Sequence, residues 1–154
     1  MADLMIRRAT EGDAAVLAEL SARLAECPLP SWHTRDDVAA ADWRAMMQAI
    51  RVPQPDNDVL LLERDTAAVG CLHVYAATDF FGRRHAHLSV IAVSAAAEGQ
   101  GVGHLLLDHA ETWARSRGLG LLTLHVRPEN ARARRFYERH DFVQELVRYA
   151  KLLG

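Results

Sequence analysis

A glycine-rich segment between a strand-like run and a helix-like run constrains the fold more than any other part of the chain. A strand-like, mostly apolar run covers Leu88 to Val93, glycine occupies alternate positions between Glu98 and His104, and residues 105–117 repeat apolar side chains at helical spacing. Glycines let backbone N–H groups converge, and the first turn of a helix adds unpaired donors and a partial positive charge. This segment therefore predicts an anion site that suits phosphate.

Two common nucleotide-binding loops do not fit this segment. A P-loop requires lysine and a hydroxyl residue after its last glycine, whereas Gly103 is followed by His104. A dinucleotide fingerprint requires a sixth-position glycine. That position is His104 when counted from Gly99 and Leu106 when counted from Gly101. A tight strand-to-helix turn without a ligand remains the structural alternative.

The composition is that of one ordinary globular domain over residues 1–154. Half of the residues are hydrophobic, and 18 basic against 20 acidic residues give a net charge of −2. This balance gives no basic excess for nucleic acid or an anionic membrane surface. No apolar run approaches the roughly 20 residues that span a bilayer, and the N-terminus does not resemble a signal peptide. We therefore expect a cytoplasmic protein.

Periodicity and turn signals predict alternating strands and helices. Thr10 and Thr34 are placed to cap the first two helices. Gly118 is placed to end the helix after the glycine segment. The expected strands cover residues 5–9, 59–63, 69–75, 86–93, 121–127 and 142–152, and the expected helices cover 11–26, 35–51, 102–117 and 131–140. The predicted fold is one α/β (α+β) domain.

The second half of the chain carries a spaced motif. It consists of a strand-like run from Leu122 to Val126, then Asn130, Ala133, Phe136-Tyr137-Glu138 and Asp141-Phe142. This motif resembles the closing motif of the GNAT superfamily of acyl-CoA-dependent N-acetyltransferases. The glycine segment resembles the pyrophosphate loop of the same superfamily, Gln/Arg-x-x-Gly-x-Gly/Ala. Two positions depart from the pattern, because Glu98 replaces Gln or Arg and Asp141 replaces Gly.

The resemblance implies a fold, a co-substrate and a reaction. The fold is a mixed, mostly antiparallel central sheet flanked by about four helices, with two splayed parallel central strands. The co-substrate is acetyl-CoA, whose acetyl group passes directly to a primary amine of a small molecule or peptide, without a metal. The residues implied to bind it are Ile91, Ala92, Val93, Glu98, Gly99, Gln100, Gly101, Val102, Gly103, His104, Asn130, Arg134 and Tyr137.

Tyr137 and Asn130 are the expected catalytic side chains. A phenol held near the leaving thiolate can protonate it, which is the role expected of Tyr137; a packing tyrosine is the alternative. Asn130 lies two helical turns earlier and shares a face with Tyr137. It either binds the cofactor arm or a water, or serves only as a helix cap. A backbone N–H near Ile91 is expected to stabilise the oxyanion.

The sequence does not identify the general base that removes a proton from the amine. His87, His125, Asp79, Glu63 and a water molecule are the candidates. His85 and His87 alternate onto one strand face, but without a nearby third ligand they do not predict a metal site.

Aromatic residues in two loops are candidates for the acceptor pocket. Trp32 and His33 lie in the first loop, and Phe80 and Phe81 lie in the second. They can equally seal a core edge or form a homodimer contact. Alternative functions remain: a non-catalytic acyl-CoA-binding or sensor module, an acetyltransferase for protein N-termini or lysines, and an unrelated nucleotide-binding domain.

Overall fold

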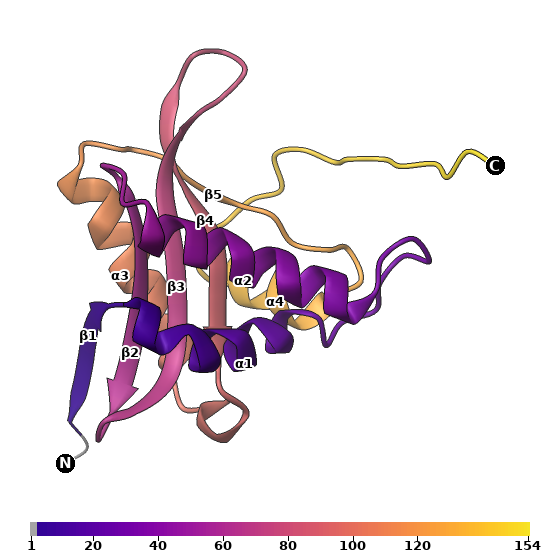
Figure 1. Ribbon diagram of the computed structural model, residues 1–154. Coiled ribbons are helices and arrows are strands. Elements are labelled where there is room, and N and C mark those ends of the chain that lie inside the picture. The colour runs from indigo at the N-terminus through magenta and orange to yellow at the C-terminus, as the bar shows by residue number, and fades with distance from the viewer. Residues whose placement is uncertain (1–2) are drawn as a thin grey trace.

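Five strands form one sheet in the order β1-β2-β3-β4-β5 (Figure 1). They are seen in a computed structural model that describes residues 3–154. Neighbouring strands are antiparallel except β4 and β5, which are parallel. The strands are β1 (Leu4–Arg8), β2 (Asn57–Arg64), β3 (Ala67–Thr78), β4 (Arg84–Val93) and β5 (Leu122–Leu124). The predicted mixed, mostly antiparallel sheet is confirmed.

Helices cover both faces of this sheet. On one face α1 (Ala14–Leu24) and α2 (Arg35–Arg51) lie side by side, as Figure 1 shows, and bury Leu17 and Met46 against the strands. On the other face lie α3 (Val102–Ser116) and α4 (Ala131–Glu138). The predicted Thr34 cap is present, because its hydroxyl oxygen accepts a hydrogen bond from the Asp37 N–H at 3.1 Å. Two short 3-10 turns, Glu11–Asp13 and Ala95–Ala97, precede α1 and the glycine segment.

Gly70 allows α3 to pack closely on the sheet. A Cβ atom added at Gly70 would lie 2.8 Å from Cδ1 of Leu106 and 2.9 Å from the carbonyl oxygen of Ala92. A side chain here would therefore push α3 away from β3 and β4.

The parallel pair β4 and β5 opens after a short contact. The paired residues run only from Ala86 opposite Leu122 to Leu88 opposite Leu124. Beyond Leu88, β4 continues to Val93 without a partner on that side among the described residues. The two strands therefore splay apart, as the resemblance implied.

The expected final strand over residues 142–152 is wrong. The structure assigns no strand after Asp141, and this segment, the C-terminal tail, leads away from the sheet (Figure 1). Several of its apolar side chains are exposed, including Val143, Leu146 and Tyr149. Alternating apolar residues favour a strand, but a strand also needs a hydrogen-bonded neighbour. As a result β5 lies at the edge of the sheet rather than inside it.

Candidate active site at the splayed strands

The glycine segment ends in a set of free backbone donors at the start of α3. Gly101 caps the helix with a left-handed φ of 79°, and Gly99 has a φ of 75°. The Gln100 N–H is already donated to the Ala97 carbonyl at 3.3 Å. No backbone acceptor among the described residues takes the N–H groups from Gly101 to His104. These four donors and the helix dipole suit a phosphate group.

Glu98 is held by arginines from two other elements. Its Oε2 atom lies 2.6 Å from an Nη atom of Arg23 in α1, and its Oε1 atom pairs with Arg132 in α4. A carboxylate beside a bound phosphate would be unfavourable if it were unpaired. Here two guanidinium groups offset its charge.

The N–H of Ile91 points into the opening between β4 and β5. Ser94 donates its N–H to the Val69 carbonyl at 2.9 Å, and hydrogen-bonded pairs alternate along an antiparallel ladder. Leu72 and Ile91 therefore form a pair without hydrogen bonds between them, and the N–H and C=O groups of Ile91 face away from β3. The Val93 carbonyl points the same way and accepts a hydrogen bond from Nε of Arg23 at 3.1 Å. Ile91 thus presents a backbone donor along the splayed edge.

Tyr137 lies on α4, among aromatic neighbours. Its ring centroid is 5.3 Å from that of Phe136 and 5.6 Å from that of Phe142. Burial raises the pKa of Tyr137 to about 12, so the phenol keeps its proton near neutral pH. Among residues 3–154 no partner hydrogen-bonds its hydroxyl group. The hydroxyl is therefore free to bind a ligand.

Asn130 serves as the N-cap of α4. Its Oδ1 atom accepts a hydrogen bond from the Ala133 N–H at 3.2 Å. The side-chain amide group remains for another contact. Arg134 donates to the Pro128 carbonyl at 3.2 Å, and this bond ties the first turn of α4 to the preceding loop.

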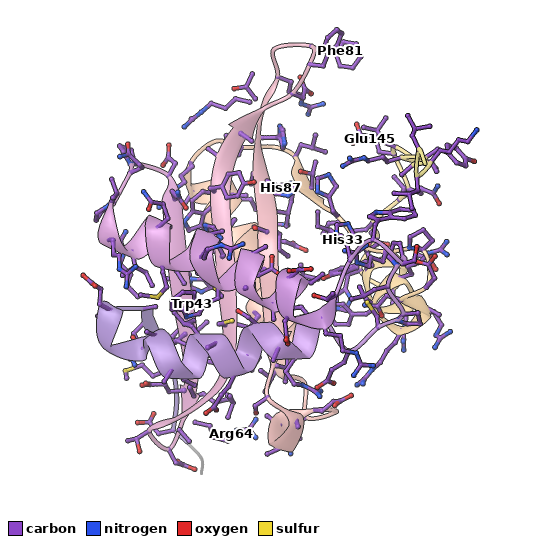
Figure 2. All side chains as sticks on the ribbon, turned by 45° about the vertical axis from the view of Figure 1, so that its right-hand side comes forward. His33, Trp43, Arg64, Phe81, His87 and Glu145 are labelled. Carbon is purple, nitrogen blue, oxygen red and sulfur yellow. The ribbon has the colours of Figure 1, made fainter. Side chains whose placement is uncertain are left out.

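A row of rings crosses the face of the sheet that carries α1 and α2. His73 and Tyr75 of β3, His87 of β4 and His125 after β5 have successive centroid distances of 5.5, 5.4 and 4.9 Å. Figure 2 shows His87 beyond α2, toward the β3–β4 hairpin. Burial, together with His125 and His85, lowers the pKa of His87 to about 4. The imidazole of His87 is therefore neutral at neutral pH.

A hydrogen bond holds one ring nitrogen of His87, Nδ1. Nδ1 of His87 lies 2.8 Å from the Thr123 hydroxyl oxygen, and that hydroxyl lies 3.4 Å from the Ala86 carbonyl oxygen, so in one neutral tautomer Nδ1–H donates to Thr123 while Thr123 donates to Ala86. In a neutral imidazole the other nitrogen then carries a lone pair. In that tautomer Nε2 of His87 is an unprotonated acceptor.

The two carboxylate candidates for the general base have structural partners instead. Glu63 accepts hydrogen bonds from Nε and an Nη atom of Arg7 at 3.0 and 2.7 Å. Asp79 accepts the backbone N–H groups of Phe81 and Arg83 at 2.9 and 2.8 Å, which shapes the β3–β4 turn. These contacts leave the two histidines, His87 and His125, as the side-chain candidates for the base, and their ring centroids lie 4.9 Å apart.

The aromatic residues expected at the acceptor pocket are not brought together. Phe80 and Phe81 are 96% and 90% exposed, and Figure 2 shows Phe81 at the tip of the hairpin, away from His33. Trp32 instead lines a hollow with Ala150 and Leu152 of the C-terminal tail.

Two features of this region escaped the sequence analysis. Asp42 on α2 is partly buried, and burial raises the pKa of its carboxyl group; a carboxylate one turn before the buried Met46 was the available signal. His104 and His140 form a hydrogen-bonded pair at 2.6 Å that joins the first turn of α3 to the turn that follows α4. No local sequence pattern indicates this contact, because the two histidines are 36 positions apart and β5 lies between them along the chain.

The chain belongs to the GNAT acetyltransferase family. The sequence pattern of the family described as "Acetyltransferase (GNAT) family" matches residues 17–142. A mycothiol acetyltransferase of Beutenbergia cavernae is 43% identical over 58 residues, which are 38% of this chain and 20% of that protein. The chain thus matches only about a fifth of that curated relative's length.

Solved structures share the fold over nearly the whole chain. A transcriptional regulator from Bacillus halodurans C-125 has a TM-score of 0.71 and 25% identity, covering 98% of this chain and 100% of the other. The aminoglycoside N-acetyltransferase AAC(6')-Iy in complex with CoA also has a TM-score of 0.71, with 16% identity and coverage of 98% and 96%. Among residues 3–154, no helix is long and apolar enough to cross a membrane.

Proposed function

We propose that this chain binds acetyl-CoA and transfers the acetyl group directly to a primary amine. The observation that carries the proposal is the opening between β4 and β5, with four free N–H groups from Gly101 to His104 at one end and the free N–H of Ile91 along its edge. A Cβ atom added at Gly99 or Gly101 would meet no atom within 4 Å, so a phosphate has room to approach. We propose residues 1–154 as one domain with this activity.

Each side of the opening has a role in holding the coenzyme. The N–H groups of Gly101, Val102, Gly103 and His104 bind the pyrophosphate, while Glu98, Gly99 and Gln100 shape the loop. The β4 edge from Ile91 through Ala92 to Val93 binds the pantetheine arm by its backbone. On the opposite side, α4 contributes Asn130, Arg134 and Tyr137. Acetyl-CoA supplies the acyl group as a thioester.

Three groups of the chain act on the reacting atoms. The Ile91 N–H donates to the carbonyl oxygen as it becomes an oxyanion. Nε2 of His87 accepts a proton from the amine nitrogen when the forming N–C bond makes that nitrogen acidic. The Tyr137 hydroxyl donates a proton to the leaving sulfur. No acyl-enzyme is needed, and Cys71 is buried with a pKa raised to about 12.

Two experiments test this function together. Calorimetry with CoA measures binding, and a thiol-release assay with acetyl-CoA and a panel of amines measures transfer, with the acetylated nitrogen located by mass spectrometry. We expect CoA binding and amine-dependent thiol release. CoA binding without turnover on any amine would instead support a non-catalytic binding module, and turnover only on peptides would support an acetyltransferase for protein N-termini or lysines.

We also propose a homodimer in the cytoplasm. The exposed apolar side chains of the C-terminal tail, and an outer edge of β5 that pairs with no strand among residues 3–154, support association with a second copy. Light scattering of the full chain and of a variant ending at Phe142, which keeps the ring that packs against Tyr137, tests the assembly. We expect a dimer for the full chain and a monomer for the shortened one, and a monomeric full chain would contradict the proposal.

A further inference from the structure

His104 and His140 connect the start of α3 to the turn that follows α4. Nδ1 of His104 lies 2.6 Å from Nε2 of His140, and the two ring centroids are 4.8 Å apart. Among residues 3–154, the backbone N–H of His104 is also one of the four at the glycine segment that no backbone acceptor takes. The contact between the two rings therefore begins at the proposed phosphate site.

Each ring of this pair has a second contact that orients it. Nδ1 of His140 lies 2.7 Å from the carbonyl oxygen of Phe136, and a carbonyl oxygen only accepts, so Nδ1 of His140 carries a hydrogen. When His140 is neutral, its Nε2 then accepts the Nδ1–H of His104. Nε2 of His104 lies 3.3 Å from Oδ2 of Asp108, one turn further along α3. Both imidazoles are thus held from two sides.

His140 also holds the residues that surround the proposed general acid. Its backbone N–H donates to the carbonyl oxygen of Tyr137 at 2.9 Å, and its ring centroid lies 4.5 Å from that of Phe136. The Phe136 ring lies in turn against the glycine segment, because a Cβ atom added at Gly103 would lie 3.5 Å from it. Phe136 and His140, which flank Tyr137 along the chain, therefore both reach the start of α3.

α4 depends on contacts of this kind for its position. It has eight residues, none of which is fully buried, and an isolated helix of this length is not stable in water. The chain after Asp141 forms no strand that would tie the end of α4 to the sheet. Arg132 holds the start of α4 through its ion pair with Glu98, and the histidine pair holds the end.

We propose that His104 and His140 are positioning residues, which place the Tyr137 hydroxyl at the leaving sulfur when phosphate groups occupy the start of α3. This inference rests on the proposed acetyl transfer. Phosphate bound by the backbone N–H of His104 fixes the first turn of α3, and the side chain of His104 then holds His140 and with it the end of α4. Neither side chain touches the reacting atoms. The coenzyme phosphates, which are remote from the thioester, thereby contribute to kcat as well as to binding.

Thiol release from two acetyl thioesters tests this coupling. Acetyl-CoA carries the phosphates, whereas acetylpantetheine has the same thioester and arm without any phosphate. In the wild type we expect kcat for acetylpantetheine to be about 10- to 100-fold lower, the range that a misplacement of about 1 Å costs. Equal kcat values for the two thioesters would overturn the proposal.

The variant His140→Phe keeps a ring beside Phe136 and removes the hydrogen bond to His104. It should lower kcat for acetyl-CoA by most of the same factor and kcat for acetylpantetheine much less. A loss of the same factor for both thioesters, or no loss for either, would overturn the proposal. His109→Phe is the matched control, because His109 lies on α3 but lines a hollow with Leu4 of β1.

The variant His140→Gln tests the hydrogen bond itself. A glutamine side-chain oxygen can accept the Nδ1–H of His104 in place of Nε2, so this variant should recover most of the kcat for acetyl-CoA that His140→Phe loses. A kcat no higher than that of His140→Phe would contradict the hydrogen bond as the link between α3 and α4.

The Tyr137→Phe background separates positioning from a general loss of structure. Without the hydroxyl group no acid is left to position, so His140→Phe should then lower kcat for acetyl-CoA by less than about twofold. An equal loss in both backgrounds would overturn the proposal. If the wild type binds CoA but acetylates no amine, the proposed function fails and this inference fails with it. If the wild type is active and Tyr137→Phe slows it while His140→Phe does not, the positioning role alone fails.

Discussion

Arg132 at the start of α4 and Glu98 at the glycine segment form an ion pair across the opening between β4 and β5. Arg23 of α1 holds the second oxygen of the same carboxylate at 2.6 Å. A pyrophosphate at the start of α3 would compete with Glu98 for these guanidinium groups. We therefore expect Glu98, which departs from the family pattern, to influence coenzyme binding through these two arginines.

Glu98→Gln should bind CoA more tightly than the wild type. The change removes a negative charge near the proposed pyrophosphate site and frees both arginines. For partly exposed ion pairs we expect the affinity for CoA to rise by about two- to fivefold. Calorimetry at two salt concentrations measures it, and the gain should shrink at high salt because the charges are screened. Glu26→Gln is the control, since Glu26 pairs with Arg23 but lies outside the loop. Weaker CoA binding by Glu98→Gln would contradict this prediction.

Gly101 and Gly103 should respond differently to alanine. Gly101 has a φ of 79°, where a Cβ atom costs about 1–2 kcal/mol, so Gly101→Ala should distort the loop and weaken CoA binding. At Gly103 a Cβ atom would lie 3.5 Å from the Phe136 ring, an ordinary contact, so Gly103→Ala should bind CoA nearly as well as the wild type. Aspartate at either position should abolish binding by repulsion. Calorimetry showing normal affinity in the aspartate variants would refute the phosphate loop.

Gly70→Ala should destabilise the protein by about 1–3 kcal/mol, the usual cost of overpacking. Its Cβ atom would lie 2.9 Å from a backbone oxygen of β4, which has no room to move. Urea unfolding measures the loss. Gly120→Ala is the control, because a Cβ atom there would meet nothing within 4 Å. Equal stability of the two variants would show that α3 does not need this close approach.

The free energy of unfolding should fall as the pH decreases from 6.5 toward 4. Burial lowers the pKa of both His73 and His87 from 6.5 to about 4, so the unfolded chain binds more protons than the folded one in this window. Asp13, with its pKa lowered to about 2 by Arg7, contributes only below this window. Thermal unfolding at pH 7 and pH 5 measures the effect, and His73→Gln should reduce the difference. A melting temperature that does not fall at pH 5 would contradict it.

The sequence predicted the elements better than the contacts between them. Thr34, the turn residues and the apolar spacing define α2 locally, and the glycines with their flanking runs define the β4–α3 segment. The tail after Asp141 was predicted wrongly, because a strand depends on a distant partner as well as on its own pattern. The partners of Glu98 come from α1 and α4, which only the folded chain brings together.

The kinetics of Tyr137→Phe test the central claim most directly. The variant keeps the ring that packs against Phe136 and Phe142 and removes only the hydroxyl group. Thiol release with a good amine acceptor is measured beside the calorimetric dissociation constant for CoA. We predict a fall in kcat of about 100-fold or more, the contribution of a general acid, with CoA affinity unchanged. Unchanged turnover would contradict the account of this site as an acetyltransferase centre in which Tyr137 protonates the leaving thiolate.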